Sequence, residues 1–217
     1  VITMEFPHLP RLIEENQFDT IYQEHYSYIS LFTAIRMFEA HDLIIFDADE
    51  IPTHGGSLRI YARHRKNEGL SVRSSIKRIL DEELQAGINR LKTYLTFSGQ
   101  VEKTKRNFLE FLVKAKKDGK SIAGYGAAGK GSTFLNYCGV REDFIDFVVD
   151  RNTFKQGKYL PGVHIPIFAP EKIREAQPDY ILILPWNLKE EIMSQLAHAR
   201  QWGAKFVVAI PEIQVYD

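Results

Sequence analysis

A short apolar segment, a glycine-rich turn and the start of a helix follow one another in SIAGYGAAGKGSTFLNYCG, residues 121–139. Within it, Gly124, Gly126 and Gly129 have the spacing G-x-G-x-x-G, and Lys130 comes next. Glycines at these positions let the backbone turn tightly after a strand and let its N–H groups approach an anion at the helix N-terminus. The segment therefore predicts a strand–loop–helix unit of an α/β fold.

An acidic residue, Asp150, ends the next expected strand, 26 residues after Gly124 (150 − 124). In dinucleotide-binding folds, an acidic residue near that position binds a ribose hydroxyl. No catalytic partner for hydride transfer follows the motif, since His164 is the only histidine nearby. Three interpretations of the loop stay open: a site for a phosphate-bearing ligand, a site for a nicotinamide cofactor, and a tight turn that binds nothing.

The rest of the second half alternates strand and helix patterns. The apolar run DYILILPW, residues 179–186, is typical of a strand covered on both faces. The other expected strands lie at 144–150, 164–168 and 205–211, and the expected helices at 132–138, 170–175 and 188–202. This alternation predicts a doubly wound parallel sheet with right-handed crossovers.

The first half combines strand, helix and turn patterns. The expected elements are strands at 1–6, 43–52 and 57–64 and helices at 8–16 and 31–40. The last two strands should pair antiparallel, and residues 17–30 should form an irregular loop. Residues 68–118 predict two helices with a break near Phe97-Ser98-Gly99, where Ser98 would cap the second helix. Because the chain opens inside an expected strand, we expect a fragment of a longer protein.

Composition places the chain among ordinary globular proteins, with 44% hydrophobic and 26% charged residues in a total of 217. Basic and acidic residues balance at 28 each, so neither a nucleic acid nor a membrane surface is expected as a partner. The single Cys138 excludes an internal disulfide framework and a cysteine zinc cluster within this chain. With no apolar run of ~18–20 residues and no signal peptide, we expect a cytoplasmic protein.

The stretch TIYQEHYSYIS concentrates polar and aromatic side chains, namely Tyr22, Glu24, His25, Tyr26, Ser27 and Tyr28. Loops on a rigid scaffold commonly carry catalytic groups, and a histidine can take a proton near neutral pH. A polar aromatic loop that only seals the edge of a core is the alternative interpretation. His54, before Gly55 and Gly56, has the same two interpretations, as a site residue or as part of a turn.

Several motifs together resemble one family: EFPHLPRLIEENQFDTIYQEHYSYISL, IPTHGGSLRIYARH, GYGAAGKGSTFLNYCG, VDRNTFKQGKYLPGVHIPI and LPWNLKEEI. In this order, and over nearly the whole chain, they are similar to the S-adenosylmethionine (SAM)-dependent sugar C-methyltransferases. Those enzymes methylate a carbon of deoxysugars carried on a nucleotide diphosphate. They contain an N-terminal zinc-binding cysteine segment, a central methyltransferase domain and a C-terminal Rossmann-like domain.

The resemblance implies a division of this chain into three parts. Residues 1–67 would be the C-terminal part of the methyltransferase domain, 68–118 a helical linker and 119–217 the Rossmann-like domain. The strand at 1–6 would be the fifth of the methyltransferase sheet, and the antiparallel pair its last two strands. The SAM site would lie mostly upstream, as would the zinc site. We therefore expect no cofactor-binding residue and no metal ligand here, and no activity from this chain alone.

The resemblance also assigns site residues. Tyr22, Glu24 and His25 match a Tyr-x-Glu-His motif, in which His25 would remove a proton beside a ketone. Tyr22 would stabilise the enolate oxygen or position the sugar, and Glu24 would orient the site. The candidate residues for binding the nucleotide-diphosphate sugar are Tyr28, His54, Gly55, Lys130, Arg151, Asn152 and Lys158.

Two other functions remain compatible with the residues themselves. One is an NAD(P)-dependent oxidoreductase that uses the glycine loop. The other is a nucleotide-sugar-binding module without chemistry of its own. The sequence fixes no oligomeric state.

Overall fold

The computed structural model describes residues 1–217, which form two compact units. Unit 1 comprises residues 1–17 and 23–100, and unit 2 comprises residues 18–22 and 101–217. Residues 18–22 thus belong to unit 2, although the chain on both sides of them belongs to unit 1. No helix combines the length and the apolar character needed to cross a membrane.

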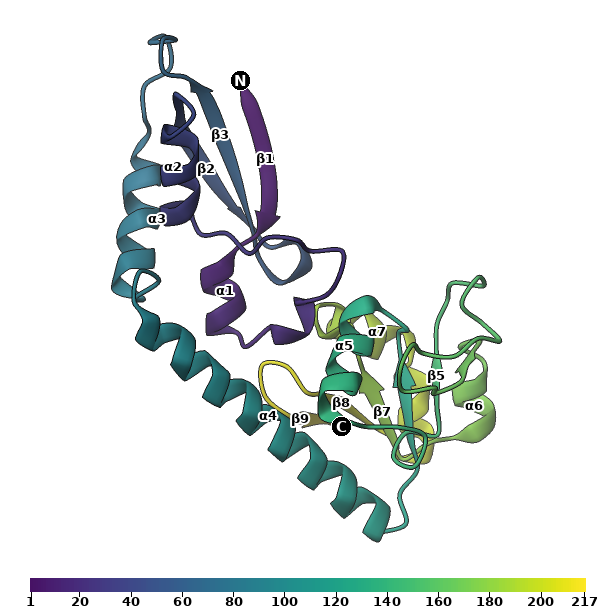
Figure 1. Ribbon diagram of the computed structural model, residues 1–217. Helices are drawn as coiled ribbons and strands as arrows, with labels where there is room; N and C mark the ends of the chain where they lie inside the picture. Colours follow the sequence, from purple (N-terminus) through teal and green to yellow (C-terminus); the bar gives the residue numbers. More distant parts are fainter. The chain divides into compact units, whose positions relative to one another are not determined.

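Unit 1 contains a three-stranded antiparallel sheet (Figure 1). Its strand order is β1-β3-β2, with β1 at Ile2–Pro7, β3 at Ser57–His64 and β2 at Leu43–Ile51. The expected antiparallel pairing of β2 with β3 is confirmed, with Ile51 opposite Ser57 and Leu43 opposite His64. Helix α1 (Leu9–Glu14) follows β1, near the expected range 8–16, and has a proline in its first turn.

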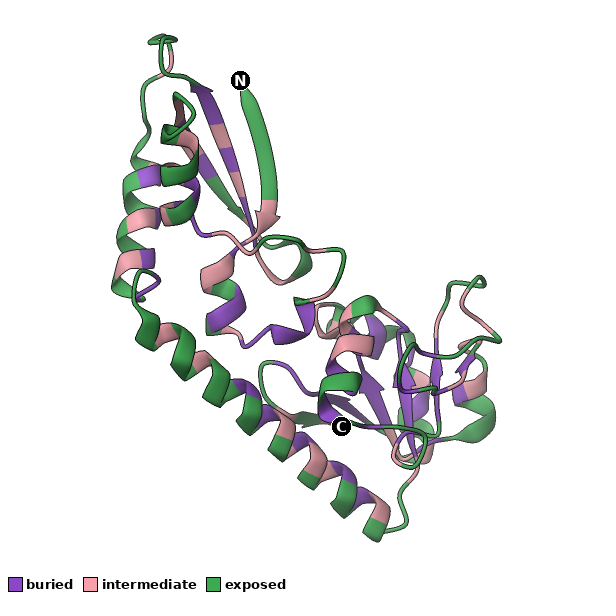
Figure 2. Cartoon of the chain, in the orientation of Figure 1, coloured by how far each residue is buried: buried purple, intermediate pink, exposed green.

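One face of this sheet carries the core of unit 1. Leu58, Ile60 and Ala62 of β3 are buried, because alternate residues of a strand point to the same side. Helices α2 (Leu31–Glu39) and α3 (Ser74–Gln85) pack on that side. In Figure 2, β3 is mostly buried whereas β1 is exposed along most of its length.

The helix break expected near residues 97–99 is wrong. Helix α3 ends at Gln85, and Gly87 follows its capping residue with a φ of +77°, a helix-terminating conformation that glycine adopts easily. Helix α4 (Leu91–Lys117) then runs without a break through Ser98 and Gly99, so Ser98 caps nothing. A glycine inside a helix costs only about 1 kcal/mol relative to alanine, and packing overrides it here. The buried residues of α4 recur at helical spacing: Val101, Thr104, Phe108, Leu112 and Ala115.

Unit 2 contains a six-stranded mixed sheet in the order β6-β5-β4-β7-β8-β9 (Figure 1). Its strands are β4 (Ile122–Tyr125), β5 (Phe147–Val149), β6 (Ile167–Phe168), β7 (Tyr180–Ile183), β8 (Lys205–Val208) and β9 (Gln214–Tyr216). The first five are parallel, as expected, and the direction of strand addition reverses between β4 and β7. The antiparallel β9 was not predicted. Only residues 209–213 separate it from β8, and a parallel return would need a crossover of about a dozen residues.

Helices cover both faces of the unit 2 sheet. The rings of Phe108 in α4 and Phe134 in α5 (Gly129–Cys138) lie 4.8 Å apart. The other face buries its apolar residues under α6 (Lys172–Ala176), α7 (Lys189–Gln195) and the 3₁₀ helix η4 (Ala197–Trp202). The single helix expected at 188–202 is therefore divided into α7 and η4. Helix α5 also begins at Gly129, three residues earlier than expected.

Substitution of Gly126 by alanine should destabilise unit 2 strongly. Its φ is +90°, and a Cβ atom there would lie 2.6 Å from Cδ of Pro185. The left-handed backbone and the steric overlap together should lower the free energy of unfolding by about 2–4 kcal/mol. Gly139→Ala is the matched control, since Gly139 has a φ of +74° and no neighbour within 4 Å. It should lose only the backbone part, about 1–2 kcal/mol. Urea unfolding measures both, and equal losses would contradict the Pro185 contact.

Candidate functional site

Side chains of unit 2 pack closely against the glycine-rich segment of the same unit. A Cβ atom at Gly131 would lie 2.7 Å from Cβ of Leu184, and one at Gly124 would lie 2.8 Å from Cγ2 of Val148. Together with the contact of Gly126 with Pro185, these distances explain the glycines as close-packing positions. The G-x-G-x-x-G spacing therefore requires no bound nucleotide.

Asp150 makes its hydrogen bonds within the loop region. Its Oδ2 accepts from the backbone N–H of Ala127 at 2.8 Å, and Nζ of Lys155 lies 3.3 Å from the same oxygen. Its Oδ1 accepts from the N–H of Asn152 at 2.8 Å. The carboxylate thus links the loop after β4 to the loop after β5 by hydrogen bonds. In a dinucleotide-binding fold, a carboxylate near this position would instead bind a ribose hydroxyl.

A second group of polar residues gathers beside the start of α5. Nε1 of Trp186 donates to Oδ2 of Asp19 at 2.8 Å. Nζ of Lys130 donates to Oδ1 of Asn187 at 2.7 Å and lies 4.4 Å from the centre of the Trp186 ring. Asp19 comes from the 3₁₀ helix η1 (Phe18–Thr20), Lys130 from α5 and the other two from η3 (Trp186–Leu188). Residues distant in sequence thus form one cluster inside unit 2.

Burial dominates the electrostatics of this cluster. Asp19 is 1% exposed, and burial raises the pKa of its carboxyl to about 6, although Trp186 and Lys130 oppose the shift. Burial also lowers the pKa of Lys130, against the attraction of Asp19. At neutral pH the Asp19 carboxylate is therefore ionised at a cost in stability.

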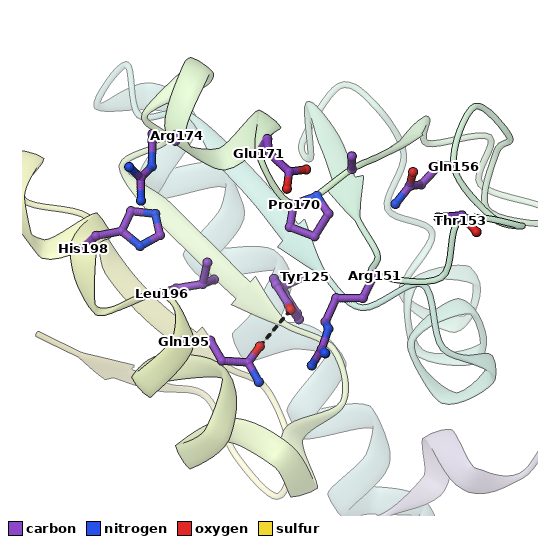
Figure 3. A pocket seen from close by; sticks show the side chains of 11 residues that line it. Tyr125, Arg151, Thr153, Gln156, Pro170, Glu171, Arg174, Gln195, Leu196 and His198 are labelled. Atoms are coloured by element: carbon purple, nitrogen blue, oxygen red, sulfur yellow. Dashed lines mark hydrogen bonds between the residues drawn. The ribbon is translucent and has the colours of Figure 1, made fainter.

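A cleft of about 780 Å³ opens in unit 2 where the carboxyl ends of β4, β5 and β6 meet, within the range of small-molecule sites (Figure 3). Tyr125, at the end of β4, donates its hydroxyl to Oε1 of Gln195 at 3.2 Å. Figure 3 shows Arg174 and His198 at one end, Thr153 and Gln156 at the other, and Tyr125 between them.

The charged residues of this cleft are mostly basic. Arg151, Arg174 and His198 line it, whereas Glu171 is the one acidic residue in the lining. Nη1 of Arg151 is 3.9 Å from a carboxylate oxygen of the exposed Glu191, a distance that leaves the guanidinium open to another anion. The cleft can therefore receive an anionic ligand that also has an apolar part.

The remaining candidates in unit 2 differ in exposure. Asn152 accepts a hydrogen bond from the N–H of Phe154 through its Oδ1 at 3.0 Å, so it shapes the loop after β5. Lys158 is exposed. Tyr22 is half-buried, and its ring lies against Gly129, since a Cβ atom on that glycine would be 3.2 Å from Cε2 of the tyrosine. Of the expected phosphate-binding residues, only Arg151 lines the cleft.

His25 lies in unit 1, on the irregular segment 23–28. It is half-buried, whereas Glu24 is exposed. The hydroxyl of Tyr28 donates to the backbone carbonyl of His25 at 3.1 Å, and the two rings meet edge to face at 6.4 Å. Tyr28 itself packs against a small apolar cluster that contains Leu12. The imidazole thus sits on a segment that is anchored to the body of unit 1.

A buried carboxylate holds the end of this segment. The oxygens of Glu83 in α3 accept hydrogen bonds from the N–H groups of Leu31 and Phe32 at 2.7 and 2.8 Å. Nε2 of His8 lies 2.8 Å from Oε1 of Glu83, and both residues line a cavity of about 430 Å³ in unit 1. A carboxylate is well placed there, because the N-terminus of a helix has unpaired N–H groups and a partial positive charge.

The turn after β2 contains the last two candidates. His54 is exposed and has a φ of +54°. The carbonyl of Gly55 accepts a hydrogen bond from Nε2 of Gln17 at 2.7 Å. These contacts make the turn a defined structural feature of unit 1.

Comparison with known proteins identifies the family. Residues 52–211 match the family described as C-methyltransferase C-terminal domain. Over 212 residues, the chain is 39% identical to C-methyltransferase NovU of Streptomyces niveus, a match that covers 98% of this chain and 50% of that protein. The chain belongs to the C-methyltransferase family.

This C-methyltransferase chain spans about half the length of the curated relative that it matches. The resemblance recognised in the sequence is confirmed.

Several residues of the polar cluster and of the cleft in unit 2 were not predicted from the sequence, among them Asp19, Trp186, Arg174 and His198. Asp19 lies three residues before the Tyr-x-Glu-His motif, and Trp186 follows the buried run of β7, so both had a positional signal. Arg174 and His198 lie on helices far apart in the sequence and had none. Only the folded sheet brings their helices to the same cleft.

Asp19→Asn should change the pH dependence of stability. The pKa of Asp19 is raised in the folded chain, so the folded state binds its proton more tightly and loses stability as pH rises through about 4 to 6. Asparagine keeps an oxygen for the Trp186 N–H and removes the charge. The variant should gain stability relative to wild type by roughly 2–3 kcal/mol between about pH 4 and pH 7. Urea unfolding across this range tests it, and a difference independent of pH would contradict the buried charge.

Proposed function

We propose that this chain is the C-terminal portion of a SAM-dependent enzyme that methylates a carbon of a nucleotide-diphosphate-linked keto-deoxysugar. The observation that carries the proposal is the family match over residues 52–211. The Tyr-x-Glu-His motif at residues 22–25 supports it, since carbon methylation beside a ketone needs a base. Unit 1 would then be the last part of the methyltransferase domain, and unit 2 a Rossmann-like domain, which its strand order supports.

His25 is the proposed base. Removal of the proton next to the sugar ketone leaves an enolate, whose carbon then accepts the methyl group. The hydrogen bond from Tyr28 to the His25 carbonyl supports this role, because it fixes the backbone from which the imidazole projects. A positioned base contributes a factor of about 10²–10⁴ to the rate. Tyr22 would donate a hydrogen bond to the enolate oxygen, and Glu24 would orient the site.

We propose no SAM site in this chain, because the family resemblance implies that this site lies in the preceding part of the enzyme. The segment 124–131 is the glycine-rich strand–loop–helix of the chain, and Val148, Leu184 and Pro185 pack against its glycines. We therefore expect the methyl donor to bind to a preceding part of the enzyme, as we expect for the structural zinc. The roles assigned to the residues of this chain concern the sugar substrate.

The cleft of unit 2 is the proposed seat of the nucleotide diphosphate. Arg151, Arg174 and His198 would pair with the phosphates, while Tyr125 would contact the apolar part of the nucleotide. Its position supports this role, since ligands of open α/β sheets bind at the carboxyl ends of the strands. If the nucleotide diphosphate binds there, the sugar attached to it would extend out of the cleft.

His25→Gln in the full-length enzyme should lower kcat by at least about 10²-fold, because glutamine cannot take the proton at neutral pH. SAM affinity, measured by calorimetry, should not change. His41→Gln is the matched control, as His41 is exposed in the turn after α2. Turnover at the wild-type rate by the His25 variant would remove the base assignment.

Joint substitution of Arg151 and Arg174 by glutamine should weaken binding of a deoxythymidine diphosphate. Two lost charge-assisted contacts, at about 1.5–3 kcal/mol each, predict a Kd increase of more than about 10²-fold. Arg141→Gln serves as the control, because Arg141 is exposed and precedes the amino end of β5, whereas the cleft lies at the carboxyl ends of the strands. Calorimetry measures both, and wild-type affinity of the double variant would place the nucleotide elsewhere.

A further inference from the structure

We propose that the glycine loop of unit 2 and the loop after β7 form a receptor for residues 18–22 of this same chain. We further propose that Asp19 and Trp186 are positioning residues for the reaction. This second part rests on the proposed function. The occupant of the G-x-G-x-x-G loop is then the segment that leads into the Tyr-x-Glu-His motif.

Apolar contacts seat this segment on α5. Phe18 is buried, and its ring centre lies 5.9 Å from that of Phe134 and 5.2 Å from that of Tyr137. At the other end of the segment, the Tyr22 ring covers Gly129, the third glycine of the motif. A Cβ atom on that glycine would lie 3.2 Å from Cε2 of the tyrosine, so the ring would have to shift slightly to accept it. The glycine therefore has a structural role in seating this segment.

Polar contacts fix the segment in register. The hydrogen bond from Trp186 to Asp19 is directional. It is shielded from solvent, since Asp19 is only 1% exposed. Lys130 is the charged group that acts on Asp19, and it is held over the Trp186 ring and by Asn187. The lysine that would face a phosphate in a nucleotide site is thus engaged by this cluster.

The consequence concerns His25, six residues after Asp19. Residues 18–22 belong to unit 2 and the following segment to unit 1, so the receptor fixes the point from which the catalytic segment departs. Small errors in the placement of a base lower the rate of the chemical step. A loosened receptor should therefore lower kcat more than it raises KM.

The test compares two tryptophans in the full-length enzyme. Trp186→Phe keeps the aromatic ring and removes the N–H that Asp19 accepts. Trp202→Phe is the matched control, since Trp202 also donates its Nε1 hydrogen, to the carbonyl of Pro178 at 3.2 Å, and lies in η4. Trp186→Phe should lower kcat about tenfold with KM nearly unchanged and should speed hydrogen exchange in residues 18–28. Trp202→Phe should do neither.

Wild-type kcat and wild-type exchange in Trp186→Phe would overturn the proposal, as would equal effects of the two substitutions. If Trp186→Phe does not fold, Asp19→Asn and Asp19→Ala replace it. Asparagine retains the acceptor and should preserve protection of residues 18–28, whereas alanine should lose it. Equal exchange in these two variants would also refute the receptor.

Hydrogen exchange separates this inference from the proposed function. If His25→Gln remains active while Trp186→Phe still exposes residues 18–28, the base assignment fails and the receptor stands. Titration with NADH adds an independent check, since tight binding to the wild-type protein would mean that the loop accepts a dinucleotide in place of the segment.

Discussion

Two buried carboxylates control the segment between Gln17 and Leu31. Asp19 receives the indole N–H of Trp186 within unit 2, and Glu83 receives the first two N–H groups of α2 within unit 1. Between these anchors the chain has almost no regular secondary structure, so its own backbone hydrogen bonds cannot define its course. The course of residues 18–22 therefore depends on side chains from α5 and the loop after β7 within unit 2, and the end of the segment at Leu31 depends on α3 within unit 1.

The glycine loop shows that a sequence motif does not by itself establish a ligand-binding site. The backbone freedom that would let amides approach a pyrophosphate also lets Pro185 and Leu184 approach the backbone. Asp150 likewise fits a ribose hydroxyl or the N–H of Ala127 equally well by its chemistry. In unit 2 both the glycines and Asp150 have such contacts within the protein.

Local patterns were sufficient for most of the fold. Alternation in β3 predicted its bounds and its pairing with β2, and the apolar run of β7 predicted a strand covered on both faces. The failures came where tertiary packing overrides local preference. Gly99 resembled a helix break, but the buried stripe of α4 holds the helix together across it. Strand β9 is too short to give a signal of its own and exists because β8 offers it a free edge.

The candidate site was less accessible from sequence, for a geometric reason. Tyr22, Glu24 and His25 are adjacent in the chain, so a motif could report them. The basic cleft combines Arg151, Arg174 and His198 from three separate connections, and their proximity is a property of the parallel sheet. A single sequence carries no record of such a convergence. It can indicate only that carboxyl ends of parallel strands are the place to look.

Asp19 is a polar residue in an otherwise apolar contact between residues 18–22 and α5, and its presence there needs a physical reason. Phe18 alone would attach the segment to α5, and an apolar residue at position 19 would avoid the cost of an ionised carboxylate that burial opposes. Apolar contacts, however, tolerate sliding and rotation, whereas a hydrogen bond to one indole nitrogen does not. The carboxylate thus exchanges some stability for a defined register of residues 18–22 on unit 2.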